Sequence, residues 1–213
     1  MKKLLTIAIA VLFCSASAFA ALSWTYGWED GTGTALGTYG NAIVSNSMEQ
    51  AYEGTHSLKM IEDPLSGTPQ AYVWWVTGLQ DGDAVVADFY VYDTTPSASP
   101  SGRIWGHYTS DPTNIYAYSG SAGGNSTYSD GSGWTNLSWT WIFDSSGGAS
   151  DGLVVEARIY SAAGANVLYF DTASITVSND AVKIYNAAGQ AIPEPFMFSA
   201  LILGLGVLFL RKK

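Results

Sequence analysis

Cysteine is almost absent from this chain of 213 residues, which contains Cys14 alone. A single thiol cannot form a disulfide within the chain, so no covalent cross-link can stabilise the fold. Cys14 also lies in an N-terminal stretch that we expect to be removed on export. We therefore expect a mature protein with neither a disulfide nor thiol chemistry.

Basic side chains are the second scarcity. The chain has nine Lys and Arg residues against eighteen Asp and Glu residues, and five of the nine lie within the first three or the last three positions. Residues 21–192 keep 17 acidic and only four basic side chains, a net charge of −13. Such a field repels nucleic acid and anionic membrane surfaces, so nucleic-acid binding is excluded. It is compatible with neutral glycans, with divalent cations or simply with solubility.

Helix-favouring stretches are also missing between residues 21 and 190, where Gly, Ser, Thr, Trp and Tyr are abundant. Residues 84–92 show period-two alternation, with Val85 and Phe89 on one face and Asp88 and Tyr90 on the other. Further strands are expected at residues 57–61, 71–77, 103–109, 115–118, 137–143, 153–160, 167–170 and 174–177. About nine or ten short strands separated by turn residues predict an all-β fold, an antiparallel β-sandwich.

The N-terminus has the pattern of a secretory signal peptide. Lys2 and Lys3 precede a short apolar run that ends in Ala18-Phe19-Ala20, which predicts cleavage after Ala20. The alternative is an N-terminal membrane anchor, but the run is shorter than the roughly 20 residues that a transmembrane helix needs. We expect residues 1–20 to be absent from the exported protein.

The C-terminus has a different pattern. Pro193-Glu194-Pro195 is followed by uncharged residues 196–210 and by the basic residues 211–213. The basic end is expected to stay in the cytoplasm, with the preceding domain outside. This combination resembles the PEP-CTERM sorting signal, which implies recognition of Pro193, Glu194 and Pro195 by an exosortase-type processing enzyme in the membrane. The resemblance implies a transient transmembrane helix at 196–210, whereas the alternative is an ordinary tail anchor.

The exported segment carries a second resemblance through the order of its motifs. These are Glu29-Asp30-Gly31, the stretch Tyr52 to Lys59, Gly78 to Asp83, Gly133 to Leu137, and Tyr169-Phe170-Asp171. In this order they resemble the jelly-roll, galactose-binding-like carbohydrate-binding modules. The resemblance implies a jelly-roll domain over residues 21–180, followed by a linker at 181–192 and the sorting segment at 193–213. Tyr39 is the one aromatic residue between Gly33 and Gly40, where that family often has a Trp.

The same resemblance implies a structural calcium ion that joins the first and last strands. Glu29 and Asp171 match the acidic positions, and backbone carbonyls near Glu53 to Ser57 would complete the shell of oxygen ligands. The alternative is that both acids only cap turns and contact water.

Aromatic residues make up 14% of the chain, and they are the candidates for sugar binding. Trp139 and Trp141 share one face of their expected strand and are assigned to the core. The candidates for a glycan site, in or near loops, are Arg103 as a donor to hydroxyls and the aromatics Trp105, Tyr108, Tyr116, Tyr118, Tyr128 and Trp134. The alternative is ordinary packing, and Trp134 matches a position that is usually structural in the family.

Catalysis has little support in the sequence. Gly148 to Gly152 fits G-x-S-x-G, but a strand follows where that motif needs a helix. His56 and His107 lack the spacing of zinc ligands. Three functions remain open: an exported, surface-held module that binds polysaccharide, a structural component of an exopolysaccharide matrix, and, as the least supported, a glycoside hydrolase.

Overall fold

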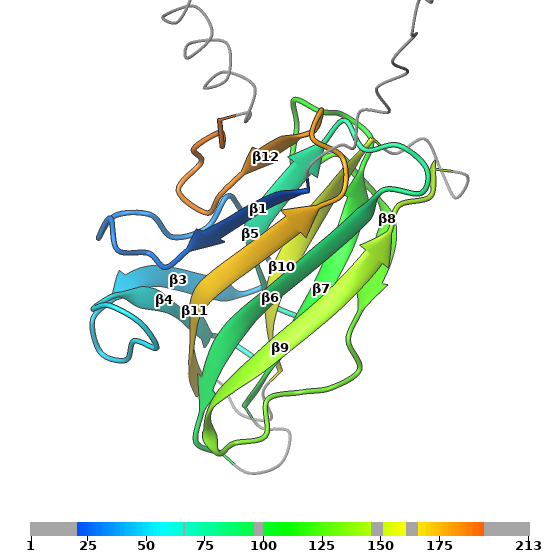
Figure 1. Ribbon diagram of the computed structural model, residues 1–213. Coiled ribbons are helices and arrows are strands. Elements are labelled where there is room, and N and C mark those ends of the chain that lie inside the picture. The colour runs from blue at the N-terminus through cyan, green and yellow to red at the C-terminus, as the bar shows by residue number, and fades with distance from the viewer. Residues whose placement is uncertain (1–20, 66, 96–99, 146–150, 161–165, 194–213) are drawn as a thin grey trace, which may run out of the picture.

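The computed structural model describes residues 21–65, 67–95, 100–145, 151–160 and 166–193, and these residues form an all-β sandwich (Figure 1). The predicted signal peptide, the chain from Glu194 onward and residues 148–150 of the G-x-S-x-G match lie outside the described residues. The described part contains twelve strands in two antiparallel sheets and no α-helix. The predicted β-sandwich is therefore confirmed.

The first sheet has the strand order β3-β4-β11-β6-β9, and β1 pairs with the second half of β11. The long strands β11, β6 and β9 lie side by side in Figure 1. The bounds of these strands are Leu22–Tyr26 for β1, Ala42–Ser47 for β3, Ser57–Glu62 for β4, Ala84–Asp93 for β6, Gly133–Ile142 for β9 and Asn166–Val177 for β11.

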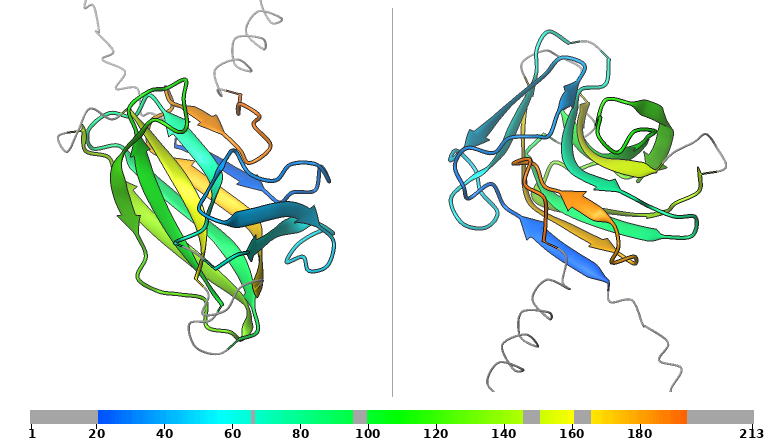
Figure 2. Two further views of the ribbon diagram at one scale, coloured as in Figure 1. Left: turned by 180° about the vertical axis from the view of Figure 1, so that it is seen from behind. Right: turned by 90° about the horizontal axis from the view of Figure 1, so that it is seen from above.

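The second sheet has the order β12-β5-β10-β7-β8, and β2 pairs with the start of β5. Figure 2 shows this sheet from behind in its left view, where β7, β10 and β5 run next to one another. The bounds are Thr38–Tyr39 for β2, Gln70–Thr77 for β5, Ser101–Thr109 for β7, Tyr118–Gly124 for β8, Gly152–Tyr160 for β10 and Lys183–Tyr185 for β12.

The core lies between the two sheets and follows the alternation expected for β6. Val85, Ala87, Phe89 and Val91 are fully buried, and the ring of Phe89 meets Phe170 of β11 edge-on at 5.5 Å. Large buried side chains of this kind each stabilise the fold by about 1.5–3 kcal/mol. Trp141 is buried as expected, but Trp139, on the same face of the edge strand β9, is 38% exposed.

The linker predicted at residues 181–192 is not a linker. Residues 183–185 form β12, which pairs with β5, and the amide of Ile192 donates to the carbonyl of Ile184. Val182, Ile184 and Ala187 are buried in the core. This short strand gains its stability from pairing with an edge of the second sheet, a long-range contact that local sequence does not reveal.

Other boundaries also differ from the expected ones. Residues 115–118 mostly form a turn that leads into β8, and the expected strands at 167–170 and 174–177 are one strand with a bulge at Thr172. Thr172 has a φ of 47°, which places it in the left-handed region. Among the described residues no helix is long and apolar enough to span a membrane, and the predicted span at 196–210 lies beyond them.

Candidate functional site

A hollow of about 480 Å³ opens on the outer face of the second sheet. Its volume lies in the range of typical small-molecule sites. Residues from β2, β5, β7, β8 and β10, together with the turn before β8, line it: Tyr39, Gln70, Tyr72, His107, Tyr116, Tyr118, Ser121, Glu156 and Arg158.

A bulge in β5 places one of the aromatic side chains in the hollow. Trp74 pairs with Val155 of β10 and Tyr72 pairs with Glu156, so Val73 is the extra residue. Because the bulge interrupts the alternation, Tyr72 and Trp75 face the same outer side although they are three residues apart. Tyr72 then lies beside Tyr116, with ring centroids 6.0 Å apart.

The end of the hollow near Tyr72 requires a glycine. The backbone of Gly37 lies so close that an added Cβ would stand 2.6 Å from the hydroxyl of Tyr116 and 2.9 Å from a ring carbon of Tyr72. Gly37 also accepts a hydrogen bond from the amide of Tyr72 through its carbonyl. A glycine here lets the segment before β2 close against both rings.

The floor of the hollow is charged, and we call Gln70, His107, Glu156 and Arg158 the charged floor. Nδ1 of His107 lies 2.5 Å from Oε1 of Glu156, and Nε of Arg158 donates to Oε2 at 2.5 Å. The Gln70 amide, in the orientation that satisfies its neighbours, donates to Glu156 at 3.2 Å and accepts from Arg158 at 3.1 Å. The carboxylate of Glu156 is only 1% exposed, so these charge-assisted bonds offset the cost of its burial.

Aromatic side chains form the walls above this floor. Tyr39, Tyr116 and Tyr118 are each more than 60% exposed, whereas Tyr72 is buried. Burial, together with the nearby charge of Glu156, raises the pKa of Tyr72 to about 12, so its hydroxyl stays protonated at physiological pH. The hollow thus combines exposed ring faces with fixed polar groups, an arrangement that suits an uncharged polar ligand with apolar C–H faces.

The same sheet face continues past Ser121 to a second aromatic group. Nε1 of Trp105 donates to the Oγ of Ser121, a residue that lines the hollow, at 2.9 Å. The guanidinium of Arg103 lies over the ring of Trp105 at 4.3 Å, and that of Arg158 lies over it at 4.8 Å. Trp105 therefore connects the charged floor to Arg103.

The structure brings some of the predicted sugar-binding residues together and separates others. Arg103 and Trp105 lie on one face of the second sheet, next to the hollow that Tyr116 and Tyr118 line. Tyr108 faces the opposite side of β7 and packs edge-on against Phe143. Trp134 belongs to the other sheet, where it contacts Tyr92.

Sequence reasoning missed most of the charged floor. Glu156 and Arg158 stand two residues apart within β10, whose other residues are mostly apolar. Charged residues at every second position of such a strand are a signal for a polar site on one face. Tyr39 was noted only as a substitute for a missing Trp, and it lies in the wall of the hollow.

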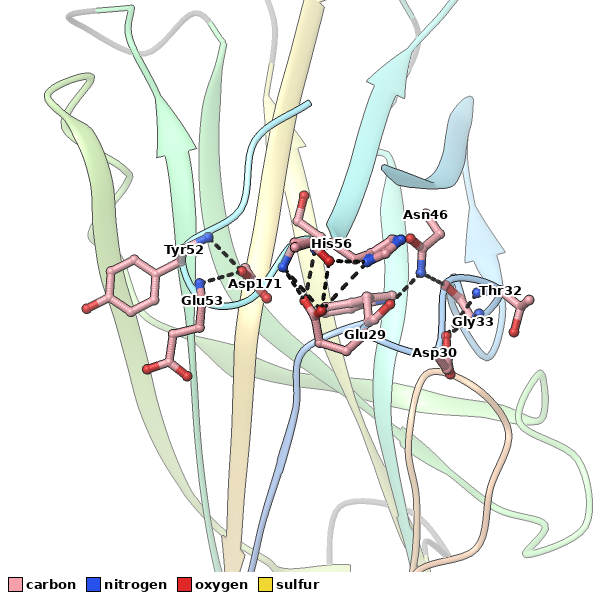
Figure 3. Close-up of polar contacts among 12 residues, drawn as sticks. Glu29, Asp30, Thr32, Gly33, Asn46, Tyr52, Glu53, His56 and Asp171 are labelled. Carbon is pink, nitrogen blue, oxygen red and sulfur yellow. Dashed lines mark hydrogen bonds and ion pairs between the residues drawn. The ribbon is translucent and has the colours of Figure 1, made fainter. Parts of the chain in front are cut away.

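The residues implied in calcium binding hold a loop directly. The carboxylate of Glu29 accepts the amides of Thr55 and His56 at 2.9–3.1 Å, and Oδ2 of Asp171 accepts the amides of Tyr52 and Glu53 at 2.7 and 3.1 Å (Figure 3). Hydrogen bonds from His56 and Thr55 lower the pKa of Glu29, whereas burial raises the pKa of Asp171.

These contacts do not fit a calcium ion as the residues stand. Calcium needs six to eight oxygen ligands, but N–H donors surround both carboxylates. Within the described ranges no three His, Cys, Asp or Glu side chains gather in a group that could hold a metal. The calcium site that the resemblance implies at Glu29 and Asp171 would require this loop to rearrange.

Comparisons with known proteins support the fold. No protein-family model matches the chain, and no curated protein matches it. Among solved structures, the N-terminal CBM22-1–CBM22-2 tandem domain of Xyn10C from Paenibacillus barcinonensis matches with a TM-score of 0.51 and 18% identity, over 78% of this chain and 47% of that chain. The CBM22-1 xylan-binding domain from the same protein gives a TM-score of 0.49 and 20% identity, over 78% and 99% of the two chains. At 18% identity the similarity to the tandem domain establishes the fold alone, a β-sandwich like that of carbohydrate-binding modules.

Proposed function

We propose that this chain is an exported, non-catalytic protein that binds polysaccharide through the hollow on its second sheet. The observation that carries the proposal is the combination, in one hollow, of three exposed tyrosines with a charged floor in which Glu156 is held by His107 and Arg158. Sugar rings can stack their C–H faces on the tyrosines while fixed polar groups take the hydroxyls. The fold similarity to carbohydrate-binding modules agrees with this proposal.

The lining of the hollow argues for binding rather than hydrolysis. Most glycosidases need two carboxylates that flank the scissile bond, about 5–9.5 Å apart. Among the described residues that line the hollow, Glu156 is the one carboxylate, and its two oxygens are occupied by His107 and Arg158. A glycoside hydrolase therefore has no support at this site.

Export and surface attachment form the second half of the proposal, and the sequence supports them. Residues 1–20 have the pattern of a signal peptide, and Pro193-Glu194-Pro195 with the segment after it resembles a sorting signal. We propose that an exosortase-type enzyme processes this segment and leaves the sandwich at the cell surface or in the extracellular matrix.

The test is binding of the full-length chain, purified in detergent, to insoluble polysaccharides and to a glycan array. We expect Tyr116→Ala and Tyr118→Ala each to weaken binding by roughly 5- to 30-fold, which corresponds to about 1–2 kcal/mol. Trp24→Ala is the control, because Trp24 is a partly exposed aromatic residue of the first sheet. Absence of binding to every polysaccharide would overturn the proposal and favour a structural matrix component, whereas product release from a polysaccharide would favour a hydrolase.

A further inference from the structure

Two of the four basic side chains in the described part of the chain lie next to each other beside the hollow. Arg103 of β7 and Arg158 of β10 are directly opposite in register, and we call them the arginine pair. Like charges at directly opposed positions of neighbouring strands destabilise a sheet. In a chain with eighteen acidic residues against nine basic ones, this concentration of positive charge needs a reason.

The two arginines differ in their partners. Arg158 donates to the carboxylate of Glu156, which neutralises its charge. Arg103 instead donates through Nε to the carbonyl of Asn125 and through Nη1 to the hydroxyl of Tyr128 at 3.4 Å. No carboxylate of the described residues forms an ion pair with Arg103.

Aromatic rings fix the guanidinium of Arg103 in place. It lies 4.3 Å from the ring centroid of Trp105 and 5.1 Å from that of Tyr128, and the Arg103 side chain is half-buried. A partly desolvated cation loses favourable hydration, and without an anion beside it no ion pair compensates for that loss. It is thus oriented in advance for an anion that arrives with a ligand.

We propose that Arg103 binds the carboxylate of a uronic acid residue in a polysaccharide whose neighbouring sugars occupy the hollow. This inference rests on the proposed function and adds the class of ligand. A guanidinium presents a planar fork of N–H donors that matches a carboxylate better than a hydroxyl. The bond between Trp105 and Ser121 places this position directly beside the hollow, so one chain of sugars can reach both.

The negative charge of the whole protein restricts the places where an acidic sugar can bind. The field of a protein with a net charge of −9 opposes the approach of an acidic polymer. Acidic sugars are therefore held only where Arg103, which forms no ion pair with a carboxylate of the described residues, reverses the local sign. Trp105 acts in this proposal as a positioning residue that stacks on both guanidinium groups rather than on a sugar.

The experiment compares each acidic oligosaccharide with its neutral counterpart. Oligogalacturonate and glucuronic-acid-substituted xylo-oligosaccharide are titrated calorimetrically into the detergent-solubilised full-length chain, beside their methyl-esterified or carboxyl-reduced forms. We expect at least one acidic form to bind about tenfold or more tightly than its neutral counterpart. A ratio of this size corresponds to the free energy of one charge-assisted hydrogen bond. Sulfated xylan is a further probe, because a sulfate offers the same negative charge on a tetrahedral group.

Variants identify the residue responsible. Arg103→Gln is expected to remove the preference, so that the variant binds the acidic form no more tightly than it binds the neutral counterpart. Arg103→Lys keeps the charge without the fork and is expected to keep part of the preference. Lys183→Gln removes a cation from β12 and is expected to change nothing, and thermal melts confirm that each variant folds.

The outcomes separate this inference from the proposed function. Equal binding of acidic and neutral forms by the unmodified protein would overturn the inference and leave polysaccharide binding in place. An acidic preference that survives in Arg103→Gln would also overturn it, as would a preference for sulfated xylan over both uronates. Absence of binding to acidic and neutral forms alike would overturn both proposals.

Discussion

Nδ1 of His107 lies 2.5 Å from the carboxylate of Glu156, and both side chains are at most 4% exposed. The two residues come from adjacent strands, β7 and β10, and meet on the outer face of the sheet instead of in the core. The same carboxylate also accepts from Arg158. A charged group buried in this way is costly unless every partner is present, so the contact makes the floor of the hollow rigid as well as polar.

Glu156→Gln tests this dependence. The substitution keeps the shape of the side chain but removes the negative charge that His107 and Arg158 share. We expect the free energy of unfolding to fall by about 1.5–3 kcal/mol, the range for hydrogen bonds to charged groups, as measured by urea denaturation.

A matched control is Glu53→Gln, since Glu53 is exposed and its side chain lies outside the hollow. That variant should stay within about 0.5 kcal/mol of the unmodified protein. Equal free energies of unfolding for Glu156→Gln and the unmodified protein would show that the charge of Glu156 does not stabilise the fold through His107 and Arg158.

The class of fold could be predicted from local patterns, because half-buried strands such as β6 alternate strictly in the sequence. The alternation of Val85, Ala87, Phe89 and Val91 is reproduced in the burial of the structure. The short strands β2 and β12 could not be predicted in this way, because each gains its stability by pairing with β5, far away in the sequence. Residues 181–192 looked like a linker for this reason.

The site was predicted only in part, and bulges explain much of the difference. Exposed aromatics such as Tyr116 and Tyr118 could be recognised from their place near turns. Tyr72 could not, because the strand around it is almost wholly apolar and the bulge at Val73 decides which way its side chain faces. Glu156 and Arg158 could be recognised as part of a site only once the pairing of β10 with β7 was known, because this pairing places them beside His107 and Arg103.

Acid titration offers a test of the contacts of Glu29. Hydrogen bonds from the His56 and Thr55 amides lower the pKa of Glu29. The deprotonated carboxylate is therefore more favourable in the folded state than in the unfolded state. This contribution to stability is fully present above the ordinary Glu pKa of about 4.3 and is lost as the pH falls through the lowered value.

We therefore expect Glu29→Gln to be less stable than the unmodified protein at pH 6, and the difference to shrink steadily as the pH drops below about 4. Urea denaturation at a series of pH values measures it. A difference in stability that is the same at pH 6 and at pH 3 would show that the carboxylate charge of Glu29 plays no part in holding the loop.

Calcium addition tests whether the loop at residues 52–56 is held by hydrogen bonds or by a metal. Asp171 lies at the bulge of β11 and binds the amides of Tyr52 and Glu53 directly, while Glu29 binds those of Thr55 and His56. Because these donors surround both carboxylates, we expect the melting temperature to be unchanged by calcium or by a chelator. A rise of several degrees with calcium, abolished in Asp171→Ala, would show instead that the loop opens to form a metal site.

The fate of the C-terminus tests the sorting proposal by intact-mass analysis of protein recovered from the cell surface. If Pro193-Glu194-Pro195 is a processing signal, the surface form should end near Pro195 and lack residues 196–213. Glu194→Ala in the motif is expected to leave the tail attached, whereas Gln190→Ala, just outside it, is expected to be processed normally.

Because residues 196–210 as a helix would rise only about 22 Å, short of the roughly 30 Å hydrocarbon core, a tail of this kind suits brief retention better than permanent anchoring. Recovery of surface protein that still carries Arg211, Lys212 and Lys213 would identify the segment as a plain membrane anchor.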